Sequence, residues 1–238
     1  MVFSVDGGTI SNNIVSDFGT AASATPDSTG INVAVGSQGE AVSDITITGN
    51  TVTDSCTGLC LWKAVDSIDV TDNTFSGCRT GVTILAGAPT NLTITGNAIT
   101  GNTGDGILIA SWAAANVITN NNISGNAGYG IENTTDPIVP VDARSNWWGD
   151  PTGPYSAPAN DWPNPGLGDS ISDHVDGQNY LTAAVTVAPT VIPDYVVVST
   201  TGVGGYLGWV DSEAVTTVAF SPNFDSDETI LVISSSDS

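Results

Sequence analysis

An asparagine recurs six times at almost even spacing over the first 149 residues, and each one is followed two residues later by an apolar side chain. The six are Asn13, Asn50, Asn73, Asn97, Asn121 and Asn146, at intervals of 37, 23, 24, 24 and 25 residues. One unit of about two dozen residues is therefore repeated, with an insertion in the first interval. Such a repeat constrains the fold strongly, because each unit must stack on its neighbours to bury its apolar face.

Each unit contains three short stretches in which apolar and polar residues alternate. Two of them flank the asparagine, as in residues 92–95 and 98–100, and the third follows a glycine eight or nine residues further on. The glycine and its aliphatic neighbour are Gly58–Leu59, Gly81–Val82, Gly106–Ile107 and Gly130–Ile131 in the four middle units. Three short strands per unit, without long helical periodicity, predict an all-β parallel β-helix of about six to seven coils with a C-terminal β-rich tail.

The repeated asparagines have a structural interpretation. At a tight turn, an asparagine can take up left-handed backbone geometry and hydrogen-bond to the asparagines above and below it in a stack. We therefore interpret all six as a structural ladder that holds the coils together, and we assign them no binding role.

The charge balance excludes two classes of partner. With 3 basic and 25 acidic residues, the net charge is −22, and the chain lacks the cationic surface that nucleic acid or an anionic membrane requires. The opening Met-Val-Phe-Ser-Val-Asp has neither a basic segment nor a long apolar core, which predicts no signal peptide and no membrane-spanning helix in this chain. The Thr/Ser/Asn/Gly-rich, Lys-poor composition is typical of secreted solenoids, so we expect an extracellular or cell-surface location.

The chain has three cysteines and one histidine. Cys56 lies two residues before Gly58 and Cys78 lies three residues before Gly81, which puts both at nearly the same corner of neighbouring coils. Because adjacent coils fall within the Cα separation that a disulfide spans, we predict a Cys56–Cys78 disulfide with Cys60 as a thiol. Three buried thiols are the alternative. His174 is far from the cysteines in sequence, so no metal-ligand spacing is visible.

These repeats resemble the right-handed parallel β-helix repeat family, the broad group that includes NosD-like periplasmic solenoids and carbohydrate-binding or sugar-hydrolase solenoids. The Ile-Thr-Gly-Asn-x-Val/Ile and Gly-Ile/Leu/Val elements carry the resemblance over about residues 5–149. Residues 146–155 and 168–175 look like the closing segment of such solenoids. We therefore expect a β-helix over residues 1–182, including a closing segment at 146–182, and a tail or further β module over 183–238. Within that tail, residues 219–230 are similar to the opening strand of a β-propeller repeat.

Enzymes on this fold usually act on polysaccharides, and the resemblance implies where their acids would lie, on the strands before the asparagine. On that face only Asp69 and Asp142 are acidic, three coils or about 14 Å apart. A glycosidase pair requires roughly 5–9.5 Å. Arg144, which a lyase would use, is two residues from Asp142, and an ordinary ion pair explains both. We therefore predict no catalytic residues.

Two other clusters contain residue types that occur in functional sites. Asp44, Asp66 and Asp69 form a weak candidate Ca²⁺ site across two coils, with solvated turn carboxylates as the favoured alternative. No other cofactor is expected. A second segment has the residue types of a nucleophilic triad: Ser170, Ser172, Asp173, His174 and Asp176. Triad members converge from separate segments, whereas these residues are crowded into one short strand.

The outward face of the strands after the glycine is less polar than a solvated face should be. We predict that it binds a glycan or a partner through Trp62, Leu85, Leu108 and Trp112. A contiguous exposed apolar patch is normally covered by something. We expect the chain's own residues 180–200 to cover it, with a second copy or a glycan stacked on the two tryptophans as alternatives.

The favoured function is a non-catalytic extracellular β-solenoid module that serves as a surface-structural or adhesive element and self-assembles end to end or through its C-terminal strands. The alternatives are a polysaccharide lyase or glycoside hydrolase, and a glycan-binding module. The expected partners are other copies of the chain, surface proteins or a polysaccharide. Neither nucleic acid nor membrane insertion is expected.

Overall fold

A computed structural model describes residues 6–16, 28–34, 42–63, 65–187, 214–220 and 230–235. Every regular element in these ranges is a β-strand. The described residues accordingly contain no helix that is long and apolar enough to span a membrane. The chain divides into two compact units, Met1–Thr190 and Val191–Ser238.

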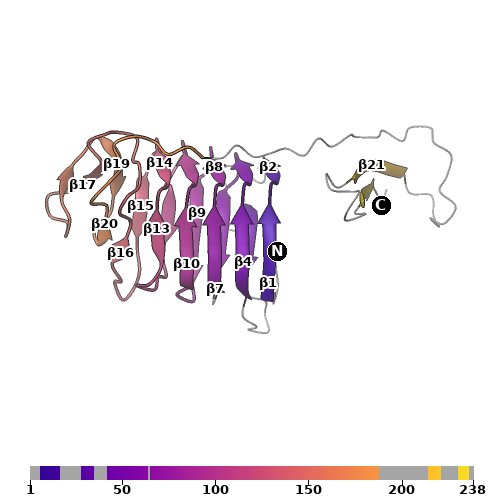
Figure 1. The fold of residues 1–238 in the computed structure, drawn as a ribbon, viewed down its shortest axis with the longest axis horizontal. Coiled ribbons are helices and arrows are strands. Elements are labelled where there is room, and N and C mark those ends of the chain that lie inside the picture. The colour runs from indigo at the N-terminus through magenta and orange to yellow at the C-terminus, as the bar shows by residue number, and fades with distance from the viewer. Residues whose placement is uncertain are drawn as a thin grey trace. The chain divides into compact units, whose positions relative to one another are not determined.

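The first unit is a parallel β-solenoid in which each coil contributes one strand to each of three sheets (Figure 1). Sheet 1 contains the strands before the asparagine: β1 (Asp6–Ser11), β4 (Val42–Thr48), β7 (Val65–Thr71), β10 (Thr90–Thr95) and β13 (Val117–Thr119). Sheet 2 contains those just after it: β2 (Ile14–Ser16), β5 (Thr51–Thr53), β8 (Thr74–Ser76), β11 (Ala98–Thr100) and β14 (Asn122–Ser124). Sheet 3 begins with β3 (Thr29–Ala34), β6 (Thr57–Trp62), β9 (Thr80–Ala86), β12 (Ile107–Ile109) and β15 (Tyr129–Asn133).

Five coils thus carry three strands each, and the predicted parallel β-helix is confirmed. Equivalent residues of successive coils pair directly, as in Ile47 with Val70 and Val70 with Ile94. The apolar residues of the three alternating stretches in each unit line one continuous core between the three sheets. Those at zero exposure are Ile47, Val70, Ile94, Val52, Phe75, Ile99, Ile123, Leu59, Val82, Ile107 and Ile131. Burial of this apolar surface is the main force that holds the coils together.

The glycine near the start of β6, β9 and β12 in sheet 3 is required by a close backbone approach. A Cβ atom at Gly58 would lie 2.5 Å from the carbonyl oxygen of Gly81, and one at Gly81 would lie 2.7 Å from that of Gly106. Coils therefore pack backbone to backbone at this position. This explains why a glycine precedes the aliphatic residue in the middle units.

The closing segment ends the solenoid at the opposite end from β1 (Figure 1). It contains β16 (Val141–Asp142), which pairs with β20 (Val175–Asp176), and three strands that extend sheet 3: β17 (Pro154–Ser156), β18 (Asn164–Pro165) and β19 (Gly168–Ile171). Trp148, fully buried, belongs to the core cluster together with Ile171 and Val175. Apolar side chains therefore fill this end of the core.

Residues 181–187 run back along the solenoid past β14 (Figure 1). The N–H of Leu181 donates to Asn146 O at 2.9 Å, and the N–H of Val185 donates to Asn122 Oδ1 at 2.8 Å. These bonds hold residues 181–187 to the coils, and the first compact unit includes them, since it extends to Thr190.

The second unit contains a two-stranded antiparallel sheet formed by β21 (Ala214–Phe220) and β22 (Ile230–Ser235). The β-propeller resemblance over residues 219–230 falls mostly outside the described residues and stays a prediction.

Candidate functional site

The predicted asparagine ladder is formed, and it uses the amide side chains fully. The backbone N–H and Nδ2 of Asn73 both donate to Asn97 Oδ1, at 2.9 and 3.0 Å. Nδ2 of Asn97 also donates to the carbonyl oxygens of Val70 at 2.8 Å and Thr95 at 3.0 Å. The same pattern links the ladder from Asn13 to Asn146. The amides of Asn50, Asn73, Asn97, Asn121 and Asn146 are buried and taken up by these bonds, which leaves them unavailable to a ligand, whereas Asn13 at the end of the ladder is exposed.

One detail of the ladder prediction was wrong. The left-handed backbone position belongs to the residue before each ladder asparagine, with φ values of 64° at Gly49, 54° at Asp72, 70° at Gly96 and 55° at Asn120. Glycine, aspartate and asparagine tolerate this conformation better than other residues do. The turn is therefore made by the preceding residue, which leaves the ladder asparagine free to point into the stack.

A second, shorter ladder lies five residues further along each coil. The N–H of Cys78 donates to Asn102 Oδ1 at 3.0 Å, and Nδ2 of Asn102 donates to Asn126 Oδ1 at 2.8 Å. It ends on a carboxylate, since Nδ2 of Asn126 donates to Asp169 Oδ2 at 2.7 Å. Desolvation by burial raises the pKa of Asp169, although the hydrogen bonds that its carboxylate accepts act in the opposite direction. The sequence hides this ladder because its members are of different residue types.

The predicted Cys56–Cys78 disulfide is not formed, and all three cysteines are buried thiols. The pairing register explains the error. The N–H of Arg79 donates to Ser55 O and that of Thr80 donates to Cys56 O, both at 3.1 Å. Cys78 therefore stacks against Ser55, and Cys56 lies one residue further along in the register. The glycine offsets of two and three residues had already differed by this one position.

Cys60 is expected to react slowly with thiol reagents. Burial raises the pKa of its thiol to about 11. The thiolate is the reactive form, so little of it is present at pH 8. Alkylation by iodoacetamide at pH 8, followed by peptide mass spectrometry, should show Cys60 labelled at least tenfold more slowly in the folded chain than in urea. Equal rates would contradict its buried position.

The predicted apolar surface on sheet 3 is smaller than the sequence indicated. Trp62 is 43% exposed, with Lys63 Nζ 5.2 Å from its ring centroid, and Leu85 and Leu108 are half-buried. Trp112, by contrast, is 3% exposed and belongs to the core, so its place in the surface was wrong. The alternation that predicted it fails because β12 ends at Ile109.

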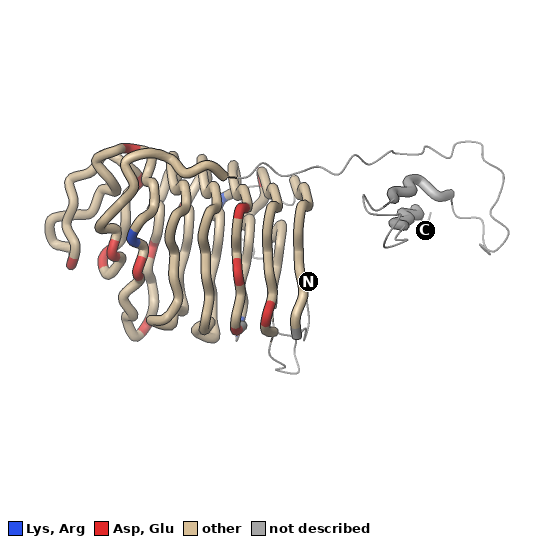
Figure 2. Tube along the Cα trace, in the orientation of Figure 1, with Lys and Arg blue, Asp and Glu red and all other residues tan. Residues whose placement is uncertain are grey.

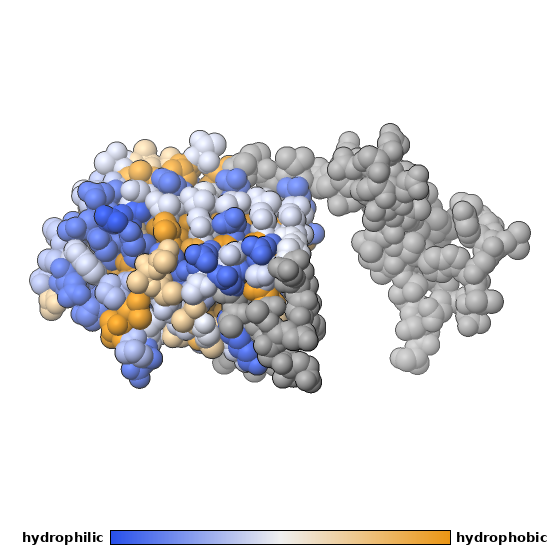
Figure 3. Space-filling model, turned by 60° about the horizontal axis from the view of Figure 1, so that its bottom comes forward, coloured by the Kyte–Doolittle hydropathy of each residue, from blue (hydrophilic) through white to orange (hydrophobic). Residues whose placement is uncertain are grey.

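The predicted alignment of Trp62 with Leu85 on sheet 3 is also absent. An irregularity after Leu61 shifts the register, so that Trp62 pairs with Ala86 instead of Leu85. Figure 3 shows the apolar residues of one face in separate groups among polar ones. The described part of the expected covering segment, residues 181–187, hydrogen-bonds at Asn122 on sheet 2 and Asn146. It therefore does not lie on Trp62 of sheet 3, and residues 188–200 are outside the described ranges.

The three aspartates of the weak Ca²⁺ prediction do not converge. The register places Asp66 between Ser43 and Thr90, and Asp69 between Thr46 and Thr93, while Asp66 accepts a bond from Asn91 Nδ2 at 2.9 Å. Asp44 lies within β4, between the paired residues Ser43 and Ile45, and has left-handed backbone geometry, with φ 53°. Within the described ranges, no set of three potential metal ligands includes any of them.

Asp142 and Arg144 form an ion pair, as the sequence indicated. Arg144 Nη2 lies 2.6 Å from Asp142 Oδ2, and its Nε lies 3.8 Å from Asp176 Oδ2. The hydrogen bond from Arg144 lowers the pKa of Asp142. The pair lines a shallow depression of about 170 Å³ with Val117, Thr119, Ser145 and Asn179. Asp142 is the only carboxylate in that lining, which offers no acid–base pair.

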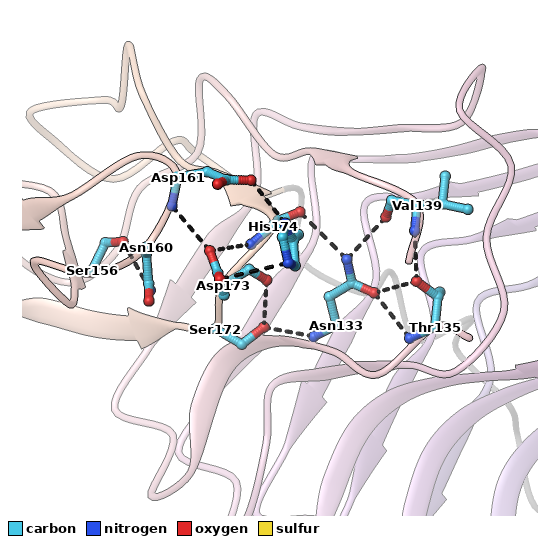
Figure 4. A network of polar contacts seen from close by, with 9 residues as sticks. All are labelled: Asn133, Thr135, Val139, Ser156, Asn160, Asp161, Ser172, Asp173 and His174. Carbon is cyan, nitrogen blue, oxygen red and sulfur yellow. Dashed lines mark hydrogen bonds and ion pairs between the residues drawn. The ribbon is translucent and has the colours of Figure 1, made fainter. Parts of the chain in front are cut away.

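The structure places Asp161, which is distant in sequence, beside Asp173 and His174 (Figure 4). His174 Nδ1 lies 2.8 Å from Asp161 Oδ2, and Nε2 lies 3.5 Å from Asp173 Oδ2. The two carboxylates therefore face opposite nitrogens of one imidazole. Asp161 was missed because it comes from a separate loop, between β17 and β18, that folds back onto the turn between β19 and β20.

Backbone hydrogen bonds fix this cluster. Asp173 Oδ1 accepts from the N–H groups of Asp161 and His174, both at 2.9 Å. These two donors, that of Asp161 first, lower the pKa of Asp173. Asn133 ties the turn to the last full coil, because its Nδ2 donates to His174 O at 3.3 Å and its N–H donates to Ser172 Oγ at 2.8 Å (Figure 4). One imidazole and two carboxylates are thus presented on an anchored turn.

In the described ranges, this cluster is the only set of three histidine, cysteine or acidic residues whose potential ligand atoms lie within 4.8 Å of one another. Acidic positions outnumber basic ones along the described chain (Figure 2). A nitrogen and carboxylate donor set suits zinc and copper(II), whereas copper(I) prefers thiolate or thioether. The cluster is therefore the place where the described residues could hold a metal ion.

Comparison with known families decides the relationship that the repeats indicated. The model of a family described as periplasmic copper-binding protein (NosD) matches residues 2–136. The chain belongs to the NosD family. In this NosD-family chain, the match covers the coils through β15 and ends before the closing segment with its Asp161–Asp173–His174 cluster. No curated protein and no solved structure matches the chain.

Proposed function

We propose that this chain is a non-catalytic, extracytoplasmic β-solenoid module that acts as a surface-structural or adhesive element. The asparagine ladder carries this proposal, because the polar groups at this corner of each coil form hydrogen bonds to the neighbouring coils. The family description as periplasmic supports the location. A rod with regular faces suits display and contact along its length.

The outer faces of the rod support the same role. Sheet 1 presents short hydroxyl side chains in register, such as Thr48, Thr71 and Thr95, and Thr71 Oγ1 donates to Thr48 Oγ1 at 3.0 Å. On sheet 3, exposed Trp62 with half-buried Leu85 and Leu108 is the proposed contact for a surface protein, with a polysaccharide as the second ligand class.

Self-assembly would use the end of the rod at β1. The strands β1, β2 and β3 are edge strands of their three sheets. The N–H of Asn12 donates to Thr48 O at 3.1 Å, so by the alternation of backbone groups the N–H of Ser11 points away from β4. A coil from another copy could accept this bond, as exposed strand edges allow.

The assembly is tested with Ser11→Pro, which removes the outward N–H and leaves the bonds to β4 in place, and with Ser11→Ala as the matched control. Light scattering after size-exclusion chromatography should show mass rising with concentration for the parent and Ser11→Ala, and a monomer for Ser11→Pro. Thermal unfolding checks that both variants fold. A parent chain that stays monomeric at every concentration would refute assembly.

The description of the family as copper-binding suggests a second function for the chain. We propose that the chain binds Cu²⁺, because its described surface offers an imidazole with two carboxylates while its cysteines are buried. This second function is independent of assembly, and direct titration with Cu²⁺ tests it.

A further inference from the structure

We propose that Asp173 and His174 are the ligands of one divalent transition-metal ion and that Asp161 orients the imidazole. The site lies on the closing segment, outside residues 2–136 that match the family. The inference rests on the proposed metal binding and not on the structural role. It names which atoms hold the ion.

The first argument is the environment of the imidazole. With one proton, an imidazole has one donor nitrogen and one acceptor nitrogen. At His174 both nitrogens face carboxylates. The distance from Nδ1 to Asp161 Oδ2 is 2.8 Å, which is that of a hydrogen bond. The distance from Nε2 to Asp173 Oδ2 is 3.5 Å, which is longer than a hydrogen bond. Two electron-rich atoms thus face each other across a gap, and a cation between them removes their repulsion.

The second argument is the size of that gap. Zinc–nitrogen and zinc–oxygen bonds of about 2.0–2.2 Å at a tetrahedral angle place the two ligand atoms about 3.4 Å apart. The observed separation between Nε2 and Asp173 Oδ2 is 3.5 Å. Metal-binding imidazoles also commonly donate their other N–H to a carboxylate, which fixes the ring. Asp161 holds this position. Water would complete the coordination of an ion at such an open site.

The third argument is charge. The whole chain has only Lys63, Arg79 and Arg144 as basic residues, and Arg144 is paired with Asp142 and Asp176. Among the described residues, no lysine or arginine forms an ion pair with Asp161 or Asp173. The side chains of the cluster are 34–49% exposed, so an ion can reach them from solvent.

The donor set selects the class of ion. Ca²⁺ and Mg²⁺ take six or more oxygen ligands, and copper(I) prefers sulfur, whereas imidazole with carboxylate suits Zn²⁺ and Cu²⁺. We therefore expect Zn²⁺ and Cu²⁺ to bind with one ion per chain and Ca²⁺ to bind weakly or not at all.

The test is calorimetric titration of the full chain with ZnCl₂, CuCl₂ and CaCl₂ at pH 7.5, with electron paramagnetic resonance on the Cu²⁺ form to detect coupling to one nitrogen. His174→Gln and Asp173→Asn should each weaken binding at least tenfold, and Asp161→Asn should weaken it less. Asp136→Asn, an exposed acid outside the cluster, is the matched control and should bind like the parent. Circular dichroism and urea unfolding check that each variant folds.

The outcomes separate the two proposals. Saturable Cu²⁺ binding that survives both His174→Gln and Asp173→Asn would place the ion elsewhere and overturn the site, while leaving copper binding by the chain intact. An absence of saturable Cu²⁺ and Zn²⁺ binding to the parent would overturn both.

Discussion

Replacing Gly81 with alanine should lower the free energy of unfolding by about 3 kcal/mol, the upper part of the range for overpacking a tight interior. A Cβ atom there would lie 2.7 Å from Gly106 O, 2.7 Å from Ile99 Cγ2 and 2.9 Å from Asn102 Nδ2. The carbonyl belongs to the next coil's backbone, so it cannot rotate away as a flexible side chain would. Urea unfolding followed by far-ultraviolet circular dichroism measures the loss.

Gly101→Ala is the matched control on the following coil. No atom lies within 4 Å of a Cβ at Gly101, but its φ is 63°, so alanine there meets only the cost of a left-handed residue, about 1–2 kcal/mol. The difference between the two variants isolates the close approach of the coils. If Gly81→Ala cost no more than Gly101→Ala, the backbone contact would not be the reason for the glycine.

Replacing Asn97 with alanine should cost about 3–4 kcal/mol, because it leaves several buried partners without hydrogen bonds. Asn97 Oδ1 accepts from the N–H and Nδ2 of Asn73, and Asn97 Nδ2 donates to Val70 O and Asn121 Oδ1. All of these groups are far from water, so none can be satisfied by solvent. The measurement is again the urea midpoint and slope.

Two further variants make the Asn97 result specific. Thr95→Ala removes an outward, half-buried side chain from the same coil and should change stability by less than about 0.5 kcal/mol. Asn97→Asp keeps the acceptor but loses the donors, so it should be at least as damaging as alanine. Hydrogen exchange should show lost protection centred on β10 and its neighbours β7 and β13, since each coil contacts only adjacent coils. A loss spread evenly over the chain would argue against this localisation.

Features that recur with the same residue type in every coil could be predicted from the sequence, and features without a common residue type were missed. The first ladder was visible because all six members are asparagine at one offset. The second was hidden because Ser55, Cys78, Asn102 and Asn126 share a position but no common side chain. The fold and its inward residues followed from alternation alone, because the period of a strand fixes which side chains face the core.

The errors at the site have a common physical cause. The alternation of side chains and the pairing register hold only within regular strands. Trp112 follows the end of β12, and an irregularity after Leu61 shifts the partner of Trp62 by one residue. The Cys56–Cys78 pairing failed by a single position of register. Asp161 reaches His174 through a loop of the closing segment, outside the repeat, where no periodicity could place it.

The ladder has a direction. In every step, the donors belong to the lower-numbered asparagine and the acceptor to the higher-numbered one. Each junction between coils therefore joins the same donor surface to the same acceptor surface, and any coil can follow any other. The rod can be lengthened or shortened by whole coils of about two dozen residues without changing a junction. An insertion that moves an asparagine off its offset breaks two junctions at once, the one before it and the one after it.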